Sequence, residues 1–187
     1  GDERFKEKMD LDIQVSKLKV LKQSYLSEHY DLEDRILKYF PQTIKECEQR
    51  IVCYEADASL ARQHQPQGEE KFCPMTVKGI TYTEKAAAGE MLLAVCKEYP
   101  MTEPAEIGSY RGFKLEVFYD TFNAHYCLYL CGKAKRKVDL GTDPLGNLTR
   151  IENELAKIPA KLEAAKIKKA ETMEQLETAK IEVEKPF

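Results

Sequence analysis

Apolar residues recur every three or four positions over long stretches of this chain, which is typical of helices with one apolar stripe. A first stripe lies within residues 4–28, at Leu11, Val15, Leu18, Leu21 or Lys22, and Tyr25. A second follows at Ile44, Cys47, Ile51, Tyr54, Ala58 and Ala61. Its spacing alternates between three and four residues, as in a heptad seam. A third seam comprises Ile151, Leu155, Ile158, Leu162, Ala165, Lys169, Thr172, Leu176, Ala179 and Val183.

Prolines and capping residues mark where these helices begin and are interrupted. Pro41 lies ahead of the second seam, and a kink or a break is expected there because proline cannot donate the backbone hydrogen bond. Pro159 predicts a kink or a restart in the third seam. The third helix is expected to start near residue 147, either with a capping box over Thr149–Glu152 or with Asn147 as the cap.

The residues between the two helical arms have the alternating pattern of a small sheet. Residues Met75–Thr83 are predicted as one strand that carries a turn or bulge at Lys78–Gly79. A helix then begins at Thr83–Glu84 and ends at Tyr99, before Pro100, with Gly89 allowing close packing. The next three predicted strands form an antiparallel meander: Ile107–Asp120, His125–Cys131 and a strand ending at Leu140.

These elements predict an α+β fold. Because the two seams flank the sheet, the simplest assembly is a long antiparallel helical stalk, similar to a coiled coil, with a small head inserted at one end. The head contains one strand, one helix and the three-stranded meander. The expected boundaries are 1–65 for the N-terminal arm, 69–146 for the head and 147–187 for the C-terminal arm.

Composition and charge narrow the functional classes. The 187 residues include 29 basic and 32 acidic side chains, a net charge of −3, and charged residues make up 33%. The average fraction is about 25%, and an excess of both signs is typical of long solvated helices. The balance argues against nucleic-acid binding by net charge, although a local basic patch can still bind. The longest uncharged run, Thr121–Gly132, is too short to span a membrane, which takes about 20 residues.

The six cysteines predict reduced thiols in a cytoplasmic protein. There is no CxxC pair, and the best metal candidate is Cys127 and Cys131 with His125 nearby. Residues four apart on a strand are separated by about 13 Å, too far for two ligands of one zinc ion. We therefore expect no metal and no cofactor.

No catalytic motif is present. The chain lacks the phosphate-binding Gly-x-x-x-x-Gly-Lys loop, the Gly-x-Ser-x-Gly elbow and the HExxH pair, and His29, His64 and His125 are far apart in the sequence. We expect that this segment is not an enzyme. Since Gly1 is followed at once by helix-forming residues, we also expect it to be an excised piece of a longer protein.

Two clusters are candidate nucleic-acid contacts. One is the basic run Lys133, Lys135, Arg136 and Lys137, in which the three lysines are expected to share one strand face; the alternative is a solvated strand edge. The other is the pair Tyr110 and Arg111, between Gly108 and Gly112. Its alternative is a bulge with the tyrosine in the core, and Arg111 could instead bond a backbone carbonyl.

Six segments resemble, in order, a region of known proteins: RFKEKMDLDIQVSKLKVLK, YDLEDRILKYFPQTIKECEQRI, GITYTEKAAAGEMLLA, IGSYRGFKLEV, LGTDPLGNLTRIENEL and QLETAKIEVEKPF. Together they are similar to the C-terminal region of very large Swi/Snf-type helicases of bacterial conjugative elements. These helicases are often fused to an adenine-specific DNA methylase. The resemblance covers about Phe5 to Phe187. It carries no motor or methylase motif, so no catalytic residue is transferred.

The resemblance implies a non-catalytic accessory module in the bacterial cytoplasm, attached to upstream helicase or methylase domains. Its head would contact DNA or a partner protein. The alternative is a protein-interaction or oligomerisation module without nucleic-acid contact. The oligomeric state does not follow from the sequence.

Overall fold

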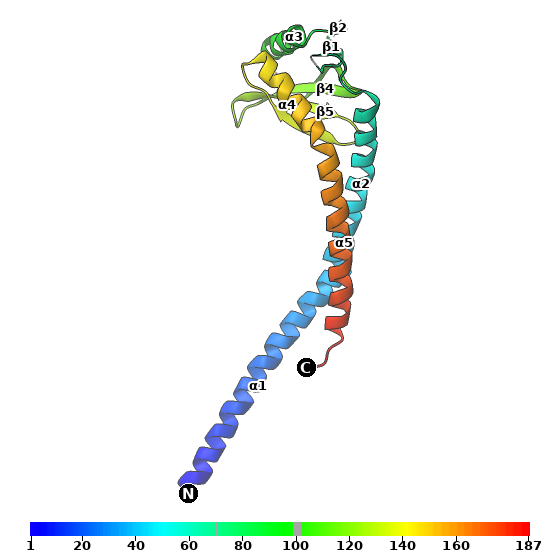
Figure 1. The fold of residues 1–187 in the computed structure, drawn as a ribbon. Helices are drawn as coiled ribbons and strands as arrows, with labels where there is room; N and C mark the ends of the chain where they lie inside the picture. The colour runs from blue at the N-terminus through cyan, green and yellow to red at the C-terminus, as the bar shows by residue number, and fades with distance from the viewer. Residues whose placement is uncertain (70, 99–101) are drawn as a thin grey trace. The chain divides into compact units, whose positions relative to one another are not determined.

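The computed structural model describes residues 1–69, 71–98 and 102–187 and divides them into two compact units (Figure 1). The helical unit comprises Gly1–Glu48 and Ile167–Phe187, and the sheet unit comprises Gln49–Lys166. The expected combination of helices and an antiparallel sheet is confirmed. Within the described residues, every helix is too short or too polar to cross a lipid bilayer.

The N-terminal arm is one uninterrupted helix of 62 residues. It consists of α1 (Asp2–Asp34), the π-helical turn η1 (Arg35–Tyr39) and α2 (Phe40–Gln63). Of the expected kink or break at Pro41, the break does not occur, because the helix continues and the turn before the proline widens instead. The N–H of Phe40 bonds to the carbonyl of Arg35, five residues back. This turn takes up one extra residue, so Ile36 and Phe40 both stay on the less exposed side of the helix.

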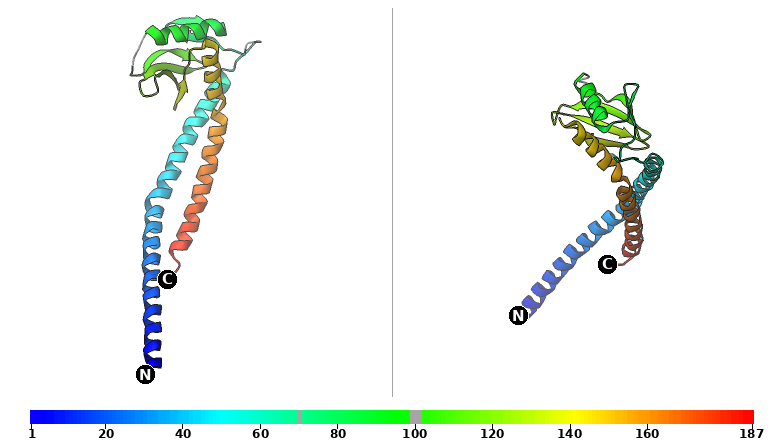
Figure 2. Two further views of the ribbon diagram at one scale, coloured as in Figure 1. Left: turned by 90° about the vertical axis from the view of Figure 1, so that its left-hand side faces the viewer. Right: turned by 45° about the horizontal axis from the view of Figure 1, so that its top comes forward.

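Within the helical unit, the N-terminal arm runs antiparallel to the end of α5 (Ile158–Val183) (Figures 1 and 2). Tyr25 Oη donates a hydrogen bond to the carbonyl of Lys185 at 2.8 Å, and Glu48 pairs with Lys169 at 3.4 Å. The less exposed residues of the arm are Tyr25, His29, Leu32, Ile36, Phe40, Thr43, Ile44 and Cys47. Those of α5 in this unit are Lys169, Thr172, Leu176, Ala179 and Val183. The C-terminal seam predicted from spacing is therefore confirmed.

The sheet unit has six strands rather than the four predicted. They are β1 (Met75–Val77), β2 (Ile80–Tyr82), β3 (Ala105–Tyr110), β4 (Phe113–Asp120), β5 (His125–Cys131) and β6 (Lys135–Asp139). Their order is β2-β1-β3-β4-β5-β6, and all neighbours are antiparallel. Two strands predicted as single are hairpins. The cause is a two-residue turn in each, Lys78–Gly79 and Arg111–Gly112, with both residues at positive φ.

Two helices lie wholly within the sheet unit, α3 (Lys85–Glu98) and α4 (Pro144–Ala156), and the end of α2 and the start of α5 also belong to it. The predicted end of the first helix at Tyr99–Pro100 lies outside the described residues. Gly89 does allow close packing, since a Cβ there would lie 2.7 Å from the carbonyl oxygen of Pro144.

The start predicted for the C-terminal arm is wrong by one turn. Asp143 caps α4 by accepting the N–H of Gly146, and Pro144 occupies the first helical position. Asn147 is buried and bonds Gly141 on both backbone groups. The predicted restart at Pro159 is confirmed, because α5 begins at Ile158.

The sheet has two unlike faces. One carries Leu115, Leu128 and Leu130, which belong to the core together with Leu92 of α3 and Ile151 of α4. Gly108 of β3 lies so close to Thr76 that any side chain would clash with its carbonyl. The other face presents Glu116, Phe118, Cys127, Tyr129 and Lys137, whose pairings place them on adjacent strands. The Phe118 and Tyr129 rings stack on this face with centroids 4.9 Å apart.

Candidate interaction surfaces

Arg136, predicted as a DNA contact, is a core residue. It lies on β6 with only 4% of its surface exposed, and its Nη1 donates to Oδ2 of Asp57 at 2.6 Å. The guanidinium also faces the Tyr54 ring at 5.3 Å from the centroid. Its Nε and Nη2 groups have no hydrogen-bond partner among the described residues. The predicted role is therefore wrong, because a DNA phosphate cannot reach a buried and already paired guanidinium.

Asp57 of α2 accepts hydrogen bonds from the turn that precedes β6. Besides Arg136, its carboxylate accepts the backbone N–H of Lys133 at 2.7 Å and of Ala134 at 3.1 Å. Gly132 permits this approach, since a Cβ would lie 2.3 Å from Oδ1 of Asp57. Sequence reasoning missed Asp57, although an acidic residue beside Ala58 on the buried side of a heptad seam is a usable signal.

The lysines of the basic run are exposed but mostly paired with acids. Lys135 Nζ lies 2.9 Å from Glu116, and that contact raises the pKa of Lys135. Lys137 Nζ lies 3.4 Å from Asp120 and 3.8 Å from Asp139. Lys133 precedes β6, so the prediction that three lysines share one strand face is wrong for this residue. Neighbouring acidic side chains therefore balance most of the positive charge of the run.

Tyr110 is a core residue rather than a presented side chain. It is 1% exposed, its ring stacks on Phe72 at 5.5 Å, and its hydroxyl donates to the Glu152 carboxylate. Burial, with the nearby carboxylate, raises the pKa of Tyr110. The predicted DNA contact is wrong for this residue, and the alternative position in the core is confirmed.

Arg111 links three parts of the sheet unit. Its Nε donates to the carbonyl of His64 at 2.6 Å and its Nη2 to the carbonyl of Ala61 at 2.8 Å. Its Nη1 pairs with Glu152 at 2.8 Å. Both carbonyls are at the C-terminal end of α2, where helix carbonyls lack partners inside the helix and cations are favoured. The alternative prediction, an arginine that bonds backbone carbonyls, is confirmed.

The first part of α1 presents large apolar side chains to solvent. The whole helix contains no buried residue. Four residues define what we term the α1 stripe: Leu11 (60% exposed), Val15 (48%), Leu18 (57%) and Leu21 (58%). Within the helical unit, no other element lies beside this part of the helix (Figures 1 and 2). The α1 stripe is therefore a candidate interaction surface of this unit.

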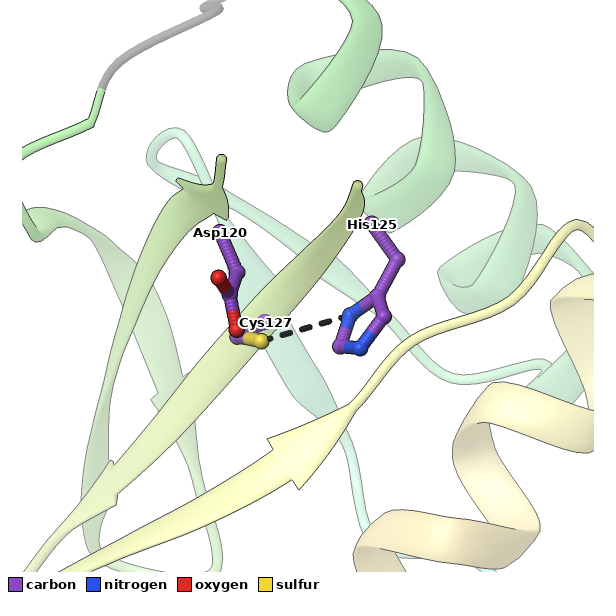
Figure 3. Close-up of side chains that lie close together, drawn as sticks. All are labelled: Asp120, His125 and Cys127. Carbon is purple, nitrogen blue, oxygen red and sulfur yellow. Dashed lines mark hydrogen bonds between the residues drawn. The ribbon is translucent and has the colours of Figure 1, made fainter. Parts of the chain in front are cut away.

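A small polar cluster lies at the β4–β5 hairpin. Asp120, His125 and Cys127 bring their ligand-type atoms within 4.8 Å of one another (Figure 3). The sequence analysis had paired His125 and Cys127 with Cys131. The structure instead adds Asp120, which is opposite His125 in the register. This acid was missed because it comes from the neighbouring strand.

Comparison of the chain with family models, with curated proteins and with solved structures finds no match.

Proposed function

We propose that this chain is a non-catalytic interaction module that associates with a second copy of itself through the α1 stripe. The observation that carries the proposal is the continuity of the apolar positions. The seam that packs on α5 includes Tyr25, His29 and Leu32, and its spacing continues backwards at Leu18, Val15 and Leu11, with Lys22 as one polar position next to Leu21 of the stripe. The same stripe is thus covered on one side of Tyr25 and exposed on the other.

The exposed leucines supply the driving force. Full burial of a leucine side chain contributes about 1.5–3 kcal/mol relative to solvent exposure. A helix in a protein gains most of its stability from packing of its apolar face against a neighbour. Leu11, Leu18 and Leu21 together therefore favour a helical partner over solvent.

The charges of α1 select an antiparallel second copy as that partner. With a two-fold axis between Gln14 and Val15, Leu11 faces Leu18 of the other copy. Acidic and basic residues are then matched along the helix: Glu7 with Lys22, Asp10 with Lys17, and Asp12 with Lys19. At about 100° per residue, the last two pairs lie on opposite flanks of the stripe. A parallel pairing would place like charges together, which is unfavourable.

Sedimentation equilibrium of the whole chain tests this association. A concentration-dependent dimer is expected, and Leu11→Asp with Leu18→Asp should give a monomer. Val52→Asp is the matched control, because Val52 is an equally exposed helix residue outside α1 (66%). A chain that stays monomeric at every concentration, or a dimer that survives the double substitution, would overturn the proposal.

The charge register has its own test. Asp10→Lys with Asp12→Lys should weaken the dimer, and adding Lys17→Asp with Lys19→Asp should restore it. Restoration distinguishes an antiparallel pair of copies from binding to an unrelated helix. Zero-length cross-linking of the native chain should join Asp12 of one copy to Lys19 of the other. Absence of the Asp12–Lys19 link in the cross-linked dimer would contradict the antiparallel register.

The resemblance to mobile-element helicases and methylases supports an accessory role for such a module beside those domains. DNA contact by the head keeps little support, because Tyr110 and Arg136 are buried and Lys135 and Lys137 are paired. A salt titration separates the two functions, since phosphate binding weakens steeply as salt rises. We expect the chain not to bind DNA in this way. A DNA affinity that weakens with salt and is lost when the three lysines are replaced would instead support DNA contact.

A further inference from the structure

We propose that Asp120, His125 and Cys127 form a binding site for a divalent transition metal such as Zn²⁺. Asp120 is the last residue of β4, and its register partner His125 is the first of β5. Cys127 is two residues further along β5, so it lies on the same sheet face as His125. Asp139 of β6 is the register partner of Cys127.

The distances suit one small ion. Cys127 Sγ lies 3.5 Å from His125 Nδ1 and 3.5 Å from Asp139 Oδ1 (Figure 3 shows the first contact). One ligand atom each of Asp120, His125 and Cys127 lies within 4.8 Å of the other two, so these three groups can face one ion, whereas Asp139 approaches the other ring nitrogen, Nε2, at 3.9 Å. Tetrahedral zinc with bonds of about 2.0–2.3 Å holds its ligand atoms roughly 3.3–3.8 Å apart. The groups therefore need only small side-chain rotations to converge on an ion.

The donor set favours one class of metal. A thiolate, an imidazole and carboxylates are typical of Zn²⁺ and its neighbours, whereas Ca²⁺ and Mg²⁺ prefer oxygen ligands alone. Asp120 is pre-positioned, since its carboxylate accepts the N–H of Phe122 and of Asn123. Cys127 is buried and His125 is half-buried, so the ion would be partly shielded from water.

Lys137 is the internal competitor for this site. Its ammonium lies 3.4 Å from Asp120 and 3.8 Å from Asp139, the two carboxylates that flank the cysteine. Entry of the metal displaces this ammonium from the carboxylates. The Cys127 thiol releases one proton to solvent as its sulfur bonds the ion, and no electrons are transferred.

Titration of the whole chain with Co²⁺ tests the site. A thiolate ligand produces a near-ultraviolet charge-transfer band, and tetrahedral coordination produces strong visible bands. We expect both to saturate at one ion per chain and to disappear on addition of Zn²⁺. Cys127→Ser should abolish the charge-transfer band, and His125→Ala should weaken binding at least about tenfold. Cys131→Ser is the matched control, because this cysteine is on the same face four residues away.

Lys137→Met gives a readout that misfolding cannot mimic. Removal of the competing ammonium should raise the Co²⁺ affinity several-fold, whereas a damaged fold would lower it. An absent charge-transfer band, a band that survives Cys127→Ser, or an unchanged affinity in Lys137→Met would each overturn the proposal. Because the dimer test depends only on α1, failure of either proposal leaves the other measurable.

Discussion

The carboxylate of Asp57 lies 2.6 Å from Nη1 of Arg136, and both side chains are almost fully enclosed. The pair joins α2 to β6, two elements far apart in the sequence. Each partner is also held by a second contact: Asp57 by backbone N–H groups and Arg136 by the Tyr54 ring. The enclosure makes each charge dependent on the other.

Loss of one member of this pair should be severe. Asp57→Ala is expected to cost about 3–5 kcal/mol of unfolding free energy, because it leaves a buried guanidinium without its counter-charge. Replacing both residues by leucine should cost less than the sum of the single changes. Urea unfolding measures each value. Lys135→Ala is the control, since its ion pair with Glu116 is exposed to solvent and contributes little to stability. If the loss of unfolding free energy in the double variant equalled the sum of the losses in the two single variants, the coupling would be contradicted.

Arg111 should matter for stability rather than for binding. Arg111→Ala is expected to lower the unfolding free energy by about 2–4 kcal/mol, because Glu152 and two helix carbonyls lose their donor. Arg111→Lys should recover only part of this, since one ammonium cannot reach three acceptors in the geometry of a guanidinium. Chemical denaturation compares the two variants with Arg62→Ala, an exposed arginine near the end of the same helix. Equal stability of Arg111→Ala and Arg62→Ala would refute this role.

Cys96 makes stability fall at high pH. This buried thiol of α3 has its pKa raised from 9.0 to about 11 by burial. The folded state therefore binds the proton more tightly than the unfolded state, so its contribution is complete below pH 9 and is lost as pH rises toward 11. The loss is about 2 kcal/mol at the upper end. The test compares unfolding free energies of the native chain and Cys96→Ala between pH 8 and 11. The difference between the two should shrink with rising pH, and a constant difference would exclude the assignment.

Two neighbouring seam residues of α5 should respond unequally. Ile158 is fully buried, so Ile158→Ala is expected to cost about 2–5 kcal/mol. Leu162 is partly exposed, and Leu162→Ala should cost clearly less because less surface leaves the core. Thermal unfolding with both variants in parallel gives the ranking. The reverse order would show that burial does not govern the cost at this seam.

Helix periodicity predicted the two seams because heptad spacing reports directly on which side of a helix is covered. The turn at Lys78–Gly79 was expected as a turn or bulge, but the strand Ile107–Asp120 was predicted as continuous, since Arg111–Gly112 lacks the asparagine or aspartate that usually marks such turns. The binding roles of Tyr110 and Arg136 failed for another reason. Composition indicates where charge and aromatic rings are in the sequence, but only the fold reveals that Arg136 is paired with Asp57 and Tyr110 with Glu152.

The π-helical turn at Arg35–Tyr39 accommodates a skip residue, that is, one residue inserted into the heptad repeat. The apolar positions before it and those from Ile44 onward follow the same heptad, displaced by one residue. Without the wide turn, this displacement would rotate the α1 stripe away from the seam by about 100°. Deleting Leu37 together with Pro41→Ala should therefore yield a regular helix with a single unbroken heptad. A one-residue deletion between Leu18 and Tyr25, where no wide turn absorbs the change, should instead swing the stripe off the seam and uncouple the two halves of the helix.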